Sequence, residues 1–195
     1  MSGMDIIDYQ IIGNDSQYVE IELDPGEAAV GEAGAMLFME QDIAMETVFG
    51  DGSASNQTQG FFGKLMKAGG RLVTGESLFT TVYMHQGRSG KRKVAFAAPY
   101  QGQILPMHLS ELGGELICQR DSFLCAAKGV SLSVAFQKKI GTGLFGGEGF
   151  IMQRLKGDGL AFVHAGGTLI ERTLRPGEKL RGYWLFGSTI TLCRL

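Results

Sequence analysis

The stretch YVEIELDPGEAAV, residues 18–30, decides how this chain is expected to fold. Tyrosine and two glutamates at positions 18, 20 and 22 alternate with valine, isoleucine and leucine at positions 19, 21 and 23, which is the period of a half-buried β-strand. Pro25 and Gly26 fit the two central positions of a type II turn, where glycine supplies the positive φ. The stretch therefore predicts a strand, a tight turn, a glutamate and a new strand.

The same arrangement recurs further along the chain. LRPGEKLR begins at Leu174, and a weaker echo, LGGELICQ, begins at Leu112. Each reads as a strand end, a Pro-Gly or Gly-Gly turn, a glutamate and a further strand. Modules of similar build favour a stacked or prism-like β architecture over a βαβ one.

Short apolar segments separated by glycine-rich turns continue this pattern along most of the chain. The 195 residues include 30 glycines without a collagen period, which is typical of all-β chains with many tight turns. Several segments are apolar on both faces, as expected of strands covered by a second sheet or a neighbouring subunit. The sequence predicts one all-β domain over residues 1–195, built of antiparallel modules in a pseudo-repeated sandwich or prism. The further predicted strands are AMLFME, SLFTTVYMHQ, KVAFAA, ELICQR, SFLCAA, VSLSVAFQ, FIMQRL, LAFVHA and TLIERTL.

One segment has a helical pattern instead. GFFGKLMKAGGRLV, residues 60–73, places Phe61, Leu65 and Leu72 near one helical face, with lysines and an arginine around it. It predicts a short helix near residues 60–70 that bridges two β modules. The alternative is a cationic amphipathic helix that docks on a membrane surface or a partner.

The charge and the cysteines limit the classes of function. The formal net charge of −2 gives no electrostatic basis for binding nucleic acid. The one basic cluster, GRSGKRKV (87–94), is predicted to be a solvated hairpin tip, with a phosphate-binding patch as the alternative. Cys118, Cys125 and Cys193 form neither a disulfide framework nor a zinc spacing, and MSGMDIIDYQ (1–10) has no secretory pattern, so a cytoplasmic protein is expected.

KKIGTGLFGGEGFIMQRL, residues 138–155, contains glycines in the spacing of a dinucleotide-binding loop. That loop requires a helix after the last glycine, and only FIMQRL follows before the next glycine-rich turn, so a strand is predicted and the dinucleotide interpretation fails. The glycines instead permit close approach of another chain or sheet, or of a ligand. Gly146, Gly147, Glu148 and Gly149 are the candidate ligand or interface residues, and no cofactor is predicted.

No other motif indicates catalysis. The three histidines, His85, His108 and His164, lack metal-ligand partners at nearby positions, and a structural histidine with satisfied hydrogen bonds is expected at strand ends. Ser77 lacks the second glycine of a nucleophile elbow. An enzymatic function would need two titratable groups brought together by the fold, such as Glu148 with His164. No catalytic or metal-binding residue is predicted.

Five segments together resemble a known family: GESLFTTVYMHQG, AFAAPYQGQILPMHL, DSFLCAAKGVSL, GLFGGEGFIMQRLKGDGLAFVHAGG and LRPGEKL. They are similar to the bacterial family related to the mitochondrial-biogenesis (altered inheritance of mitochondria) protein, from about residue 6 to residue 181. The resemblance implies an all-β fold of the tryptophan RNA-binding attenuation protein-like superfamily and assembly into homo-oligomers such as trimers. It implies scaffolding rather than catalysis, because the mitochondrial relatives are implicated in inner-membrane organisation.

The tail after Arg181, GYWLFGSTITLCRL, departs from the family pattern. One possible coding of GYWLFGST, read one base later, encodes Asp-Thr-Gly-Cys-Leu-Val-Ala, which resembles the family at this point. The favoured hypothesis is a frameshift that removes the terminal strands and leaves an unpaired sheet edge. The alternative is a genuine, divergent terminal strand, and the sequence of the coding DNA distinguishes the two.

Two functions are expected from these observations. The first is a non-enzymatic, self-associating structural or scaffold protein, peripheral to a membrane and in contact with membrane-associated proteins. The alternative is a module that binds a small molecule or peptide near residues 141–149, in a pocket between β modules.

Overall fold

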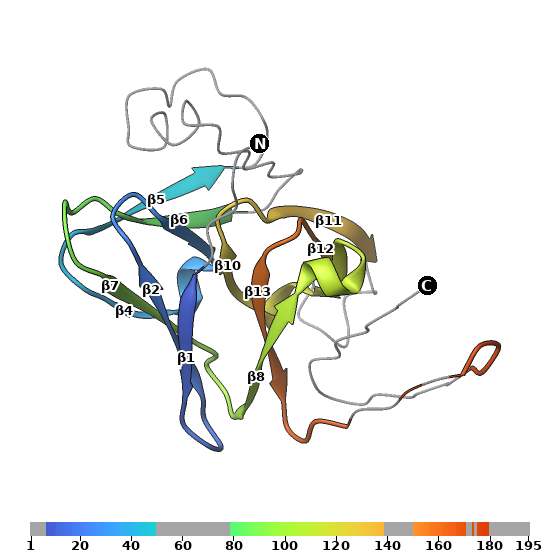
Figure 1. The fold of residues 1–195 in the computed structure, drawn as a ribbon. Coiled ribbons are helices and arrows are strands. Elements are labelled where there is room, and N and C mark those ends of the chain that lie inside the picture. Colours follow the sequence, from blue (N-terminus) through green and yellow to red (C-terminus); the bar gives the residue numbers. More distant parts are fainter. Residues whose placement is uncertain (1–6, 50–78, 139–149, 171–172, 174, 180–195) are drawn as a thin grey trace.

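The computed structural model describes residues 7–49, 79–138, 150–170, 173 and 175–179. In these residues thirteen strands form three sheets, and every strand pair is antiparallel (Figure 1). The all-β fold predicted from the sequence is confirmed. The strands are β1 (Asp8–Ile12), β2 (Tyr18–Leu23), β3 (Ala28–Gly31), β4 (Met36–Met39), β5 (Ile43–Phe49), β6 (Phe79–His85), β7 (Arg92–Ala97), β8 (Gly102–His108), β9 (Glu115–Gln119), β10 (Phe123–Ala127), β11 (Ser131–Lys138), β12 (Phe150–Lys156) and β13 (Leu160–Gly166).

The three sheets differ in size. Sheet A has the order β1-β2-β7-β4, sheet B the order β5-β6-β3-β10-β13-β8, and sheet C the order β11-β12-β9. Three short 3-10 helices connect strands in the described residues: η1 (Ala33–Ala35), η2 (Leu109–Leu112) and η3 (Arg120–Ser122). The helix predicted near residues 60–70 lies outside the described residues. None of the helices in the described part of the chain has the length and hydrophobicity to span a membrane.

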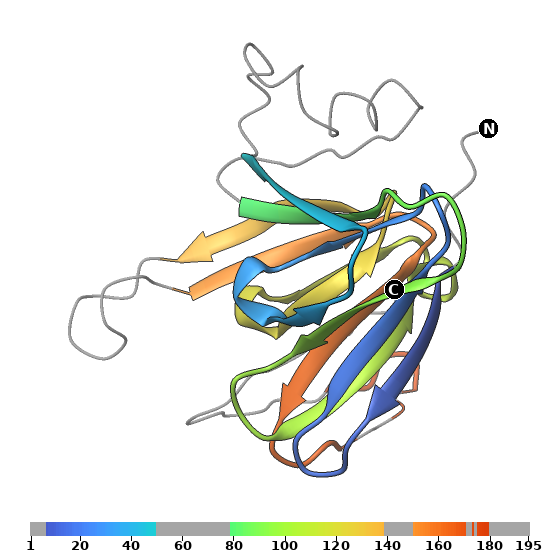
Figure 2. The ribbon, with the colours of Figure 1, turned by 90° about the vertical axis from the view of Figure 1, so that its left-hand side faces the viewer.

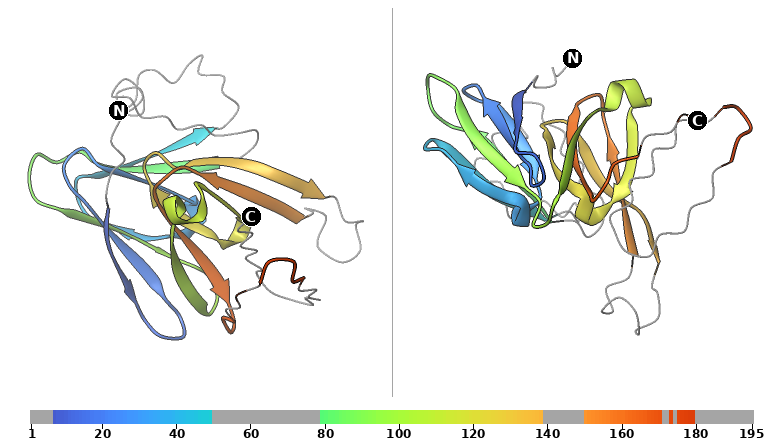
Figure 3. Two further views of the ribbon diagram at one scale, coloured as in Figure 1. Left: turned by 45° about the vertical axis from the view of Figure 1, so that its right-hand side comes forward. Right: turned by 90° about the horizontal axis from the view of Figure 1, so that it is seen from below.

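Sheet B is the central layer, because its two faces are covered by different sheets (Figures 2 and 3). Side chains of a strand alternate between faces, and β3 follows this rule. Ala28 and Val30 pack in the core shared with sheet C, whereas Ala29 packs in the core shared with sheet A. The central strands therefore bury both faces, and all five residues of β10 are buried. This burial on both sides explains why several segments of the sequence are apolar on both faces.

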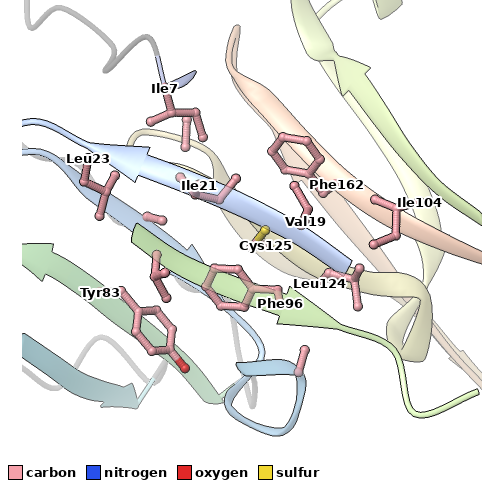
Figure 4. Packing of buried hydrophobic residues seen from close by; sticks show 14 of the residues in the cluster. Ile7, Val19, Ile21, Leu23, Tyr83, Phe96, Ile104, Leu124, Cys125 and Phe162 are labelled. Atoms are coloured by element: carbon pink, nitrogen blue, oxygen red, sulfur yellow. The ribbon is translucent and has the colours of Figure 1, made fainter. Parts of the chain in front are cut away.

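The core between sheets A and B is built mainly from alternate residues of β2 and β7 facing β6, β10 and β13 (Figure 4). Val19, Ile21 and Leu23 are all fully buried, as the alternation in the sequence predicts. The Phe96 ring meets the Tyr83 ring edge-on at a centroid distance of 5.1 Å. Strand β2 thus fixes which face of sheet A is turned toward the core.

A β-bulge in β10 serves both cores. The register of β10 against β13 shifts between Phe123 and Cys125, so Leu124 and Cys125 both turn toward sheet A. Phe123 and Ala126 point to the opposite core. The bulge fills the A–B core with two consecutive side chains from one central strand.

The two Pro-Gly turns have the same geometry, as the repeat predicts. The N–H of Glu27 donates to the Asp24 carbonyl at 2.9 Å, and the Asp24 N–H donates to the Glu27 carboxylate at 2.8 Å. In the second turn Glu178 and Arg175 make the same two bonds, at 2.9 and 3.0 Å. Gly26 and Gly177 have φ of 89° and 84°, which confirms the glycine position of a type II turn.

The Gly-Gly echo at Leu112 is confirmed in its turn, glutamate and following strand β9, but a 3-10 helix (η2) and not a strand precedes the turn, which corrects that part of the prediction. Gly113, with φ of 77°, ends η2, and the Gly114 N–H donates to the Leu109 carbonyl at 2.7 Å. The chain closes a short 3-10 helix there, so Glu115 lies in a strand and pairs with Arg154 rather than with the turn.

The basic segment 87–94 is not a hairpin tip, which corrects a second prediction. Strand β6 belongs to sheet B and β7 to sheet A, so this segment carries the chain from one layer to the next. The predicted strand TLIERTL is also wrong at its described residues 168–170, which have no regular structure. No described strand pairs with them, and Ile170 is 74% exposed.

Candidate functional site

The glycine-rich candidate site lies outside the described residues. Gly146, Gly147, Glu148 and Gly149 fall in the range 139–149, so the ligand site predicted there stays a prediction, as does the pairing of Glu148 with His164. The strands on either side, β11 and β12, are described and form an antiparallel pair. The chain therefore follows the glycines with a strand, as predicted, whereas a dinucleotide loop requires a helix.

His85 is a buried histidine at a strand end, and the satisfied hydrogen bonding expected there is found at Nδ1 but not at Nε2, which has no partner among the described residues. Its Nδ1 lies 3.0 Å from the Leu23 carbonyl oxygen, and a carbonyl only accepts, so Nδ1 carries the proton. Its Nε2 is buried beside Gly87, where a Cβ atom would lie only 2.5 Å away. His85 joins the end of β6 to the end of β2.

His164 departs from that expectation at both ring nitrogens. Its side chain is fully buried in β13, and neither ring nitrogen has a hydrogen-bond partner among the described residues. The ring meets Tyr100 edge-on at a centroid distance of 4.8 Å. Burial lowers the pKa of His164, because the imidazolium would lose its hydration. The predicted satisfied histidine is therefore wrong at this position.

His108, at the end of β8, is exposed. No group of three or more histidine, cysteine, aspartate or glutamate side chains in the described ranges is placed to hold a metal ion.

A half-buried carboxylate lies where β3 ends in sheet B. Burial raises the pKa of Glu32, Arg120 of η3 opposes that effect, and Asp121 adds to it. Tyr83 lies nearby and its pKa is raised to about 12, mainly by burial. A carboxyl of raised pKa is a possible proton donor or acceptor, but the described side chains around it present no reacting partner.

The two described cysteines are unsuited to thiol chemistry. Cys118 and Cys125 are free and fully buried, and burial raises the pKa of the Cys118 thiol to about 12 and that of Cys125 well above its usual range. The thiolate is the reactive form, so both behave as small apolar core residues. Cys193 lies outside the described residues.

The basic residues that open β7 are engaged in ion pairs across sheet A. Lys91 pairs with Asp8, and Lys93 pairs with Glu20 at 2.8 Å. The hydrogen bond to the carboxylate is the main reason that the pKa of each lysine is raised. Arg92 pairs with Asp42 at 3.2 Å. The alternative of a phosphate-binding patch is not favoured, because carboxylates already neutralise these cations.

The surface feature that remains is a group of exposed apolar side chains on two consecutive edge strands. We call it the β4–β5 apolar strip; its members are Leu37, Phe38 and Met39 on β4 and Met45 on β5, between 37% and 53% exposed. Strand β4 ends sheet A and β5 ends sheet B, and a turn of three residues joins them (Figure 1). The register of β4 against β7 shifts between Met36 and Phe38, so the strand is irregular at this point.

Strand β4 differs from the other edge strands of the described sheets. Its sequence, MLFM, contains no polar or charged residue, whereas β1, β5, β8, β9 and β11 each contain polar residues. An edge strand presents unpaired N–H and C=O groups, and natural proteins usually protect it with charge, proline or a covering loop. The signal was present in the sequence as four consecutive apolar residues, but a buried central strand has the same appearance.

The antiparallel strands and the three-layer arrangement of the described residues place this chain among all-β proteins. The chain belongs to the Mitochondrial biogenesis AIM24 family, which matches residues 9–181. The family resemblance drawn from the sequence, over about residues 6–181, is confirmed. None of the curated proteins compared with the chain matches it.

A solved structure has the same fold. The X-ray crystal structure of protein SPYM3_0169 from Streptococcus pyogenes is similar with a TM-score of 0.56 and 22% sequence identity. The similarity covers 83% of this chain and 65% of that protein, so this chain spans less than two thirds of its relative's length. At this identity the likeness establishes the fold and carries no ligand or activity to this chain.

Proposed function

We propose that this protein is a non-enzymatic structural protein that associates with further copies of itself through the β4–β5 apolar strip. The observation that carries the proposal is strand β4, an uncharged and apolar edge strand with a row of exposed side chains. An unpaired strand edge can bind another strand through backbone hydrogen bonds. Burial of the exposed apolar side chains in the contact then stabilises the association further.

The charges on and around β4 favour a second copy of this chain as the partner that binds the β4–β5 apolar strip. Like charges placed opposite each other destabilise a strand pair. Strand β4 carries no charged residue, so pairing it with β4 of a second copy causes no such repulsion. The flanking acidic residues are already engaged, since Glu40 accepts the Lys93 N–H at 2.9 Å and Asp42 pairs with Arg92. Two copies that pair through β4 itself therefore place no like charges opposite each other in the strand pair.

The stoichiometry depends on how the edge is used. Pairing β4 with β4 of a second copy is an isologous contact and gives a dimer, whereas a trimer requires β4 to meet a different surface of the next copy. The trimer implied by the family resemblance thus predicts a heterologous contact.

We further propose a reducing compartment, the cytoplasm, because both described thiols are free. A location peripheral to a membrane, with membrane-associated proteins as partners, is part of the same proposal and rests on the family relatives.

Solution mass tests the proposal. The wild-type chain is expected to exceed its monomer mass of 21.0 kDa in light scattering, with a trimer at three times that value. Phe38→Lys places a charge on the edge, and we expect the dissociation constant to rise by about tenfold or more, which corresponds to about 1.4 kcal/mol or more.

Ile170→Lys is the matched control, because Ile170 is also apolar and exposed but lies in none of the described strands. This variant should associate like the wild type, and circular dichroism should report the same fold for both variants. A wild-type protein that stays at 21.0 kDa at high concentration contradicts the proposal, as does equal dissociation of the two variants.

A further inference from the structure

His164 lies beside a set of contacts that close one end of the A–B sandwich. The tip of the β1–β2 hairpin reaches the start of β8, where Ser16 forms a bridge with Gly102. The Gly102 N–H donates to the Asp15 carbonyl at 2.9 Å, and the Ile104 N–H donates to the Gln17 side-chain oxygen at 2.7 Å. We call these contacts the β8 latch. They cover the outer edge of β8, the last strand of sheet B.

The imidazole of His164 is packed directly against the latch. In the register of β13 and β8, His164 lies opposite Ile104, and Gly166 lies opposite Gly102. A Cβ atom on Gly102 would be only 2.6 Å from the His164 Nε2, so the ring abuts the backbone of the residue that makes the first latch bond. Tyr100, which is 42% exposed, covers the ring and lies against Gly166. Tyr100 and Gly102 thus lie against the ring, and both would have to move for water to reach it from their side.

The ring contacts Tyr100 and Gly102, which carry no charge, and η3, which also packs on β13, brings Arg120 and Asp121 to this strand. On its own strand, the neighbours on the same face are Phe162 and Gly166, and β8 contributes Gly102 and Ile104. Tyr100 is the titratable side chain in ring contact, and the hairpin tip contributes Asp15, which is exposed and holds the latch with its backbone carbonyl. Protonation would create a buried cation with no acceptor at either nitrogen within the described part of the chain.

We propose that His164 is an acid-sensitive control of the β8 latch: its protonation releases the β1–β2 hairpin tip from β8 and opens this end of the sandwich reversibly. Hydration of the imidazolium from this side requires the movement of Tyr100 and Gly102, and Gly102 makes the first latch bond. The opened state exposes the outer edge of β8, which the hairpin tip covers at neutral pH. The inference is independent of association through β4.

The direction in which pH changes the latch follows from the burial of the neutral His164 ring. Burial lowers the pKa of His164 below the unfolded value of about 6.5, so the closed latch binds fewer protons than the open one. The stability that the neutral ring gives the closed latch is fully present above about pH 6.5. It is lost as the pH falls through the lower folded-state pKa of His164. Acid therefore opens the latch, and return to neutral pH closes it.

Hydrogen exchange of the full chain tests this inference, with the amides of Gly102 and Ile104 as the two reporters. After correction for intrinsic rates, their protection should fall by about tenfold per pH unit once His164 begins to titrate. Amides of the central strands, such as Val82 and Cys125, should stay protected over the same range. His164→Leu removes the titration, and the two latch amides should then keep their protection in acid.

His85→Leu is the matched control, because His85 is equally buried but lies on a different strand, at the end of β6, with its Nδ1 bonded to the Leu23 carbonyl. It should retain the wild-type acid response. An NMR titration of the wild-type His164 ring keeps the inference testable if a variant does not fold. The inference is overturned if the latch amides stay protected at the pH where this ring is protonated, if His164→Leu leaves the acid response of these amides unchanged, or if the central amides open with them.

Discussion

Gly102 illustrates at the scale of one residue how closely the chain approaches itself at the edge of sheet B. Its φ is 157°, and a Cβ atom there would lie 2.2 Å from the Ala165 carbonyl oxygen as well as against His164. Backbone atoms cannot move aside as the end of a flexible side chain can. The position therefore requires glycine for two reasons, the backbone conformation and the space.

We expect Gly102→Ala to lower the free energy of unfolding by about 3 kcal/mol or more, because overpacking and backbone strain each cost about 1–3 kcal/mol. Urea unfolding followed by circular dichroism measures the change. Gly34→Ala is the control: Gly34 has no atom within 4 Å of its added Cβ and no positive φ. A similar loss of stability in both variants would contradict the role assigned to Gly102.

At the scale of elements, the Pro-Gly turn at residues 24–27 connects sheet A to sheet B. The Glu27 carboxylate closes it by accepting the Asp24 N–H, and the Gly26 N–H donates to the His85 carbonyl at 2.9 Å. The turn is thus bonded both within itself and to β6. Its copy at residues 175–178 has the same internal bonds but is exposed and lies outside the described strands.

Glu27→Ala is expected to destabilise the protein by about 1 kcal/mol, the usual net contribution of one hydrogen bond. The same change at Glu178 removes the same local bond, yet it should shift the unfolding free energy by less than about 0.5 kcal/mol, because no sheet depends on that turn in the described structure. Parallel urea titrations compare the two variants. Equal effects would show that the first turn has no special part in joining sheets A and B.

The edge strands explain which elements the sequence failed to predict. Strands β1, β5 and β8 were not predicted, and each of them ends a sheet. An edge strand needs less apolar sequence because one side meets solvent, and β8 contains Pro106, which is tolerated at an edge but not in a central strand. Central strands such as β10 were easier to predict because both of their faces are apolar.

At the scale of the whole molecule, sheet B couples two cores. Phe162 fills the core toward sheet A and Leu155, on sheet C, fills the other, and both are fully buried. The strands between them, β3 and β10, contribute side chains to both cores. We therefore expect one cooperative folding unit.

Phe162→Ala and Leu155→Ala test this coupling. We expect losses of about 3–5 and 2–5 kcal/mol respectively, and one unfolding transition that shifts as a whole in both variants. Circular dichroism in the far and near ultraviolet should report coincident midpoints. A second transition in either variant would mean that the layers unfold independently.

The sequence alone determined the fold class, the family, most central strands and the two Pro-Gly turns, because alternation and turn chemistry are local properties of the chain. It also determined that a strand follows the glycine-rich segment. Only the tertiary structure decided how the strands divide among three sheets, that β4 is an exposed edge, and that His164 is buried without a partner. These depend on which distant segments cover each strand, and an apolar run such as MLFM is the same in sequence whether a neighbour covers it or solvent does.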